Sequence, residues 1–156
     1  MNHEPWILGI SCSHNGAVCL LHGDEVVIAL QEERVSRLKR RRISGSRPSA
    51  ALRRCLDYAS IRAEDLSLIV LSVAGIATAP EHDLSLNPDL RDAIRTVPVL
   101  VVPHHLAHAA SAFGLSGFAD AAVLVVDGIG SPSTVMSPTI CEYDSGCSAV
   151  MPSSWA

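Results

Sequence analysis

Aromatic side chains are scarce in this sequence: only 4% of its 156 residues are Phe, Trp or Tyr. A hydrophobic core must therefore be built from Val, Leu, Ile and Ala. Charged residues are also few, at 18%, whereas apolar residues reach 48%. This balance excludes an intrinsically disordered chain and suits a buried α/β domain. The length suits one ordinary domain and is too short for two.

Long apolar runs are absent as well. No stretch approaches the roughly 18 residues that a membrane span needs, and the N-terminus MNHEPWILGISCSHNGAV has no basic region followed by an apolar one. A secretory signal is therefore not indicated. We expect a cytoplasmic protein without a membrane partner.

Cysteine pairs with metal-site spacing are missing. Five cysteines form an odd set without a CxxC motif, which indicates neither a zinc ribbon nor a disulfide framework. A net charge of −4 argues against a nucleic-acid partner.

Short apolar runs separated by turn residues define the expected fold. Residues 6–10, 17–21 and 26–30 are apolar, and Asn-Gly and Gly-Asp pairs between them predict a three-stranded antiparallel meander over 6–31. Downstream, the patterns predict helices over 48–59 and 106–115, a short helix after Pro88, and strands over 66–73, 97–102 and 121–126. This order predicts an α/β domain with a ribonuclease-H-like mixed sheet. Residues 135–156 show no period and are expected to form an irregular tail.

Three histidines stand close together at the start of the second long helix. His104 and His108 are four residues apart, so both rings can reach one ion from the same helix face, whereas His105 points elsewhere. Imidazole suits zinc or iron(II). The alternative is a helix N-terminus whose histidines only meet solvent or pack.

A second candidate site follows the strand over 121–126. Asp127, Gly128 and Gly130 form a turn in which backbone N–H groups can approach a phosphate while the carboxylate faces a cation. A plain strand-end turn, with glycine supplying the unusual backbone angles, explains the same residues.

Two further segments could contact an anion. His14 stands in a tight polar turn, where an exposed hairpin histidine is the plainer interpretation. Seven of the twelve basic residues lie in 31–47 and could hold phosphates. A solvated basic face and an RNA-binding patch are the alternatives, but no aromatic residue is interleaved for base stacking.

Taken together and in this order, GISCSHNGAVCLLHGDEVVIALQEERVSRLK, HHLAHAASAF and VLVVDGIGS resemble the N-terminal part of the carbamoyltransferase family, which modifies antibiotics and nodulation factors. The resemblance covers residues 7–133, so residues 1–134 are expected to be the N-terminal part of the catalytic domain and 135–156 a tail unlike the family. It implies half of an actin/sugar-kinase ATPase-type domain, incomplete here.

The resemblance also implies a reaction and a site. Carbamoyl phosphate and ATP would give carbamoyl-adenylate, and the carbamoyl group would pass to an acceptor hydroxyl. Its pattern assigns His104 and His108 to a divalent metal, iron(II) or zinc. It assigns His14 and Lys39 to carbamoyl phosphate and Asp127 to the neighbourhood of the metal and phosphates.

Family members are far longer than this chain, which has only one of the two halves that form the ligand cleft. We therefore expect a truncated product, a split enzyme that needs a protein partner for the missing half, or a non-catalytic module that retains metal or phosphate binding.

Overall fold

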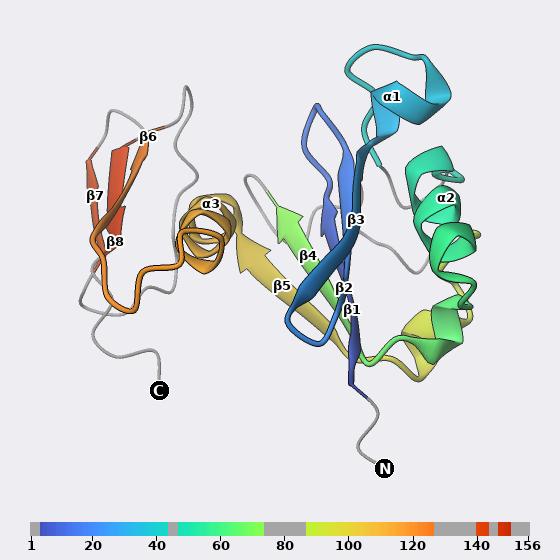
Figure 1. Ribbon diagram of the computed structural model, residues 1–156. Coiled ribbons are helices and arrows are strands. Elements are labelled where there is room, and N and C mark those ends of the chain that lie inside the picture. Colours follow the sequence, from blue (N-terminus) through green and yellow to red (C-terminus); the bar gives the residue numbers. More distant parts are fainter. Residues whose placement is uncertain (1–3, 44–46, 74–86, 127–139, 144–146, 151–156) are drawn as a thin grey trace. The chain divides into compact units, whose positions relative to one another are not determined.

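The computed structural model describes residues 4–43, 47–73, 87–126, 140–143 and 147–150, the last two ranges by their backbone only (Figure 1). The chain divides into two compact units, Met1–Val101 and Val102–Ala156, and each is described by itself.

The first unit is built on a five-stranded mixed sheet. Strands β1 (Trp6–Ser11), β2 (Ala17–His22) and β3 (Glu25–Gln31) form an antiparallel meander, as the sequence predicted. Strand β4 (Leu68–Val73) pairs in parallel with β1, and β5 (Val99–Pro103) lies beyond β4. The order β3-β2-β1-β4-β5 confirms a mixed α/β fold and places β1 at the centre.

Alternating burial explains why these residues form strands. In β1 and β2 the side chains of Leu8, Ile10, Val18 and Leu20 are buried, and their neighbours are half-buried. Successive strand residues point to opposite faces, so the buried set covers one face of the sheet. Helix α2 (Ala50–Ala59) lies beside the sheet (Figure 1) and adds its own buried stripe to the same core: Ala51, Leu52, Cys55 and Leu56.

Short helices connect the strands. Helix α1 (Glu32–Ser36), which the sequence pattern did not predict, follows β3 directly. Helix α2 begins two residues later than expected, because the Ser49 hydroxyl accepts a hydrogen bond from the Leu52 amide and acts as the N-cap. Among the described residues, two 3₁₀ turns lie in the connections, η1 (Ala63–Asp65) and η4 (Ala93–Arg95), the latter where a short helix was expected.

The second unit contains the histidine helix. Helix α3 (His104–Gly114) begins two residues earlier than predicted, with Pro103 as its N-cap residue. Strands β6 (Val123–Val126), β7 (Ile140–Tyr143) and β8 (Cys147–Val150) form an antiparallel sheet in the order β6-β8-β7. Strands β7 and β8 correct the expectation that 135–156 is irregular throughout. Strand β8 pairs with both β6 and β7, although residues 140–150 show no regular period in the sequence.

Two cysteines belong to the core. Cys12 and Cys55 are buried and unpaired by disulfides. Burial disfavours the thiolate and raises the pKa of each thiol to about 11, so both stay protonated at neutral pH. Within the described ranges, no helix has the length and apolar character to cross a membrane.

Candidate functional site

The predicted site residues fall in both units of the chain. His14 and Lys39 lie in the first unit, and the side chains of both are exposed. His104 and His108 lie on α3 in the second unit. Asp127, Gly128 and Gly130 lie outside the described residues.

Gly16 joins the turn of His14 to the segment of Lys39. The Gly16 amide donates a hydrogen bond to the Arg41 carbonyl at 3.0 Å, and the Gly16 carbonyl accepts one from the Glu32 amide at 2.8 Å. Gly16 is two residues after His14, and Arg41 is two residues after Lys39. The structure therefore ties together, through the backbone, two segments that stand 25 positions apart along the chain.

Only a residue without a side chain fits at this junction. A Cβ atom on Gly16 would lie 2.6 Å from the Ile43 nitrogen and 3.0 Å from the Arg41 carbonyl oxygen, both backbone atoms. Ile43 is itself buried in the core and cannot easily withdraw. The sequence analysis interpreted the Asn-Gly pair as a hairpin signal. The structure shows that Gly16 of this pair is also required for the close packing against Arg41 and Ile43.

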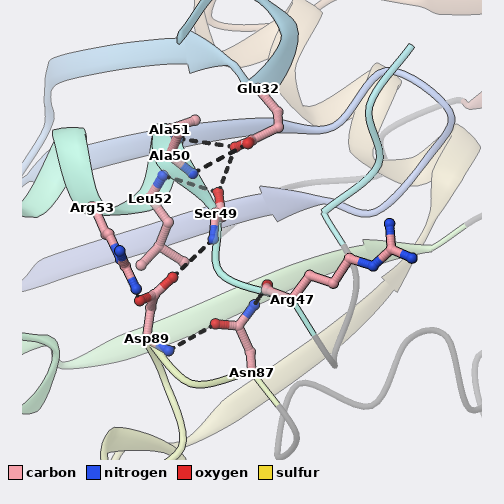
Figure 2. A network of polar contacts seen from close by, with 9 residues as sticks. All are labelled: Glu32, Arg47, Ser49, Ala50, Ala51, Leu52, Arg53, Asn87 and Asp89. Carbon is pink, nitrogen blue, oxygen red and sulfur yellow. Dashed lines mark hydrogen bonds and ion pairs between the residues drawn. The ribbon is translucent and has the colours of Figure 1, made fainter. Parts of the chain in front are cut away.

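Glu32, whose amide bonds to the Gly16 carbonyl, directs its side chain to the start of α2 (Figure 2). Its side chain is 1% exposed, yet both carboxylate oxygens are satisfied. Oε2 accepts hydrogen bonds from the Ser49 hydroxyl at 2.7 Å and the Ala51 amide at 2.9 Å, while Oε1 accepts one from the Ala50 amide at 3.2 Å. These donors belong to the N-terminus of α2, where a negative charge is favourable. Arg41 adds a cation 3.7 Å away.

Asp89 and Asn87 extend the same network (Figure 2). The Asp89 carboxylate accepts hydrogen bonds from the Ser49 amide at 2.8 Å and from Nε of Arg53 at 2.6 Å. Asn87 donates to the Arg47 carbonyl and accepts from the Asp89 amide. The network therefore fixes three separate stretches of chain around the start of α2.

Sequence reasoning missed that the buried Glu32 and the half-buried Asp89 hold the start of α2 in place through hydrogen bonds. Glu32 stands in a run of mixed charges that is typical of a solvated face. Ser49 after Pro48 was the signal available in the sequence. A helix that begins there has first backbone amides without partners in the helix, and these amides need an acceptor from elsewhere in the chain.

The histidines of α3 are arranged as their spacing predicted. Nε2 of His104 lies 3.0 Å from Nε2 of His108, and the ring centroids are 4.4 Å apart. His105 is buried, and its ring centroid is 6.0 Å from that of His104. Two ring nitrogens that each bind one ion at about 2.0–2.1 Å lie roughly 3 Å apart or slightly more, so the pair fits a metal. In the part of the chain that the structure describes, no group of three or more metal-binding side chains occurs.

Comparison with known proteins supports the resemblance drawn from the motifs. Residues 73–146 match the family model described as carbamoyltransferase N-terminus. The nodulation protein NolNO of Sinorhizobium fredii is 28% identical over 138 residues, which cover 75% of this chain and 20% of that protein. By these matches the chain is similar to the N-terminal part of the carbamoyltransferase family.

Two proteins named only by their loci are also similar. The uncharacterized protein sll1178 of Synechocystis sp. is 32% identical, over 82% of this chain and 26% of its own length. The uncharacterized protein MJ1051 of Methanocaldococcus jannaschii is 30% identical, over 80% and 22%. The chain thus spans about a fifth to a quarter of the length of these relatives.

Among solved structures, YeaZ from Pseudomonas aeruginosa matches with a TM-score of 0.48 and 20% identity, over 72% of this chain and 50% of that one.

Proposed function

We propose that this chain provides the carbamoyl phosphate-binding part of an O-carbamoyltransferase. The observation that carries the proposal is the Gly16 junction, because it ties the turn of His14 to the segment of Lys39 through the Arg41 carbonyl at 3.0 Å. Both side chains are exposed and so are accessible to a small anion. Carbamoyl transfer is the activity that the family implies, and it is proposed for the longer protein whose N-terminal part the chain matches.

The fold proposed for this binding part is one ribonuclease-H-like half of an actin/sugar-kinase ATPase-type domain. Its support is the strand order β3-β2-β1-β4-β5, in which an antiparallel meander is extended by a strand parallel to β1. In open sheets with parallel strands, ligands commonly lie beyond the carboxyl ends of the strands. The turn of His14 follows the carboxyl end of β1 and agrees with that rule.

Each group has a separate role in the proposed reaction. Lys39 supplies a point charge for the phosphate, and His14 donates a hydrogen bond to the same anion. His104 and His108 hold a divalent ion, iron(II) or zinc, which when bound polarises a carbonyl or phosphoryl oxygen. We propose that the phosphates of ATP are bound by Asp127, Gly128 and Gly130. The activated carbamoyl group, as carbamoyl-adenylate, then passes to an acceptor hydroxyl. The hydroxyl oxygen forms the new bond to the carbamoyl carbon, the bond from that carbon to the phosphate oxygen breaks, AMP leaves, and the hydroxyl proton passes to solvent.

Lys39→Ala tests the anion site. We expect the variant to weaken carbamoyl phosphate binding by roughly tenfold or more, since a hydrogen bond to a charged group contributes about 1.5–3 kcal/mol. Isothermal titration of the purified chain measures the Kd. Arg42→Ala is the matched control, because it removes an equal charge from an exposed residue three positions away. An equal loss of carbamoyl phosphate affinity in both variants would show that the anion responds to the positive charge of the whole segment and not to Lys39 in particular.

His104→Ala and His108→Ala test the metal site. Each is expected to abolish stoichiometric iron or zinc, because each removes one of two convergent nitrogens. His105→Ala, on the neighbouring but buried ring, should retain the metal. Metal content is measured by mass spectrometry after reconstitution and dialysis. The same metal content in all three variants would contradict the ligand assignment.

A further inference from the structure

Lys39 stands in a turn with an unusual backbone. Arg37 has a φ of 61° and Arg40 a φ of 53°, both in the left-handed region, and neither is glycine. Long side chains seldom adopt this conformation, so the surrounding contacts must maintain it. The two residues bracket Leu38 and Lys39, and their conformation therefore determines where the Lys39 backbone is presented.

One residue contacts both left-handed positions. The Glu33 carbonyl accepts a hydrogen bond from the Arg37 amide at 3.0 Å, which ends helix α1. The Glu33 carboxylate turns to the other end of the turn, where Oε2 accepts a hydrogen bond from the Arg40 amide at 3.1 Å. Glu33 thus spans the turn from Arg37 to Arg40 by itself.

A second tether lies directly beyond this turn. The Arg41 carbonyl accepts from the Gly16 amide, so the chain after Lys39 is held to the turn of His14. With Glu33 on one side and Gly16 on the other, the turn has little freedom to relax. A lysine side chain is flexible, and binding energy is lost when its ammonium group must be ordered at the moment of binding.

We propose that Glu33 is a positioning residue for Lys39: it fixes the left-handed turn that presents the ammonium group to a phosphate-bearing anion. This inference rests on the proposed function, since it assumes that Lys39 contacts carbamoyl phosphate. Glu33 itself touches no substrate. Its contribution is made through the Arg40 amide.

The test compares carbamoyl phosphate binding by the full chain carrying Glu33→Ala, Glu33→Gln or Arg34→Ala. Glu33→Ala is expected to raise the Kd about fivefold, while Glu33→Gln stays close to the unmodified chain because its amide oxygen still accepts from the Arg40 amide. Arg34→Ala removes the exposed ion pair at 3.8 Å with Glu33 and an exposed hydrogen bond at 3.4 Å to Gln31, but it keeps the contact between Glu33 and the Arg40 amide and should leave the Kd unchanged. In NMR spectra, the Arg40 amide resonance should move in the alanine variant and return in the glutamine variant.

A double-mutant cycle separates positioning from a merely structural role. If Glu33 acts through Lys39, then Glu33→Ala has no further effect on binding in a Lys39→Ala background. An unchanged Kd in Glu33→Ala, or the same fivefold loss with Lys39 already removed, would overturn the positioning role while leaving the proposed function intact. Absence of carbamoyl phosphate binding by the unmodified chain would instead overturn the proposed function and this inference together. Circular dichroism establishes that each variant is folded, and Glu33→Gln keeps the comparison decisive should Glu33→Ala unfold.

Discussion

Glu32→Ala is expected to lower the free energy of unfolding by about 3 kcal/mol, because buried donors that lose their acceptor cost roughly 1–3 kcal/mol each and water can reach part of the space left. The Ser49 hydroxyl and the amides of Ala50 and Ala51 all lose their partner at once. Urea unfolding followed by circular dichroism measures the change.

Two further variants define the origin of that loss. Glu32→Gln keeps the shape but exchanges one acceptor oxygen for a donor, and it should lose an intermediate amount. Glu25→Ala removes an exposed carboxylate at the start of β3 and should lie within about 0.5 kcal/mol of the unmodified chain. If Glu32→Ala were as mild as Glu25→Ala, the carboxylate network would not be a determinant of stability.

Gly16→Ala is expected to affect both stability and anion binding. The added methyl group would meet the Ile43 nitrogen at 2.6 Å, and overpacking of this kind costs about 1–3 kcal/mol. Because the atom struck is backbone, the segment after Lys39 must move away from the turn of His14. Titration with carbamoyl phosphate should then show a loss at least as large as that of Lys39→Ala.

Gly9→Ala provides the control for this substitution. Gly9 lies on β1, and a Cβ atom there would meet Cys19 at 3.7 Å and beyond, which is ordinary van der Waals contact. We expect its binding to be unchanged and its stability equal or slightly higher, since glycine weakens a strand. Normal carbamoyl phosphate affinity in Gly16→Ala would show that the junction does not position the site.

The sequence predicted those elements whose burial follows a regular period. The meander over 6–31 and the helix ending at Ala59 form as expected, because alternation and the helical stripe each report directly on one buried face. Helix α1 was not predicted, because its five residues are too few to show the helical period of apolar side chains. Strands β7 and β8 were not predicted because their residues show no regular period. The pairing of β8 with β6 is also a long-range contact that no local pattern contains.

The candidate site was predictable only in part. The spacing of His104 and His108 predicted that their rings lie close together, because helical geometry brings residues four positions apart to the same face; metal binding by the pair stays a prediction. The junction at Gly16 could not be read from the sequence, since it depends on a contact between a turn and a distant segment. The buried Glu32 was hidden for the same reason, as its partners at Ser49–Ala51 lie 17–19 positions away.

The burial of Glu32 also bears on how related chains should be judged. The first glutamate of the EER segment serves the start of α2, so a homologue that has lost catalysis would still need it in order to fold. A glutamate at the position of Glu32 in another sequence therefore indicates a shared fold and a common origin, and it does not indicate activity. His14 and Lys39 are exposed. If they bind the anion as proposed, an inactive descendant would be free to change them, and their presence would then distinguish active members.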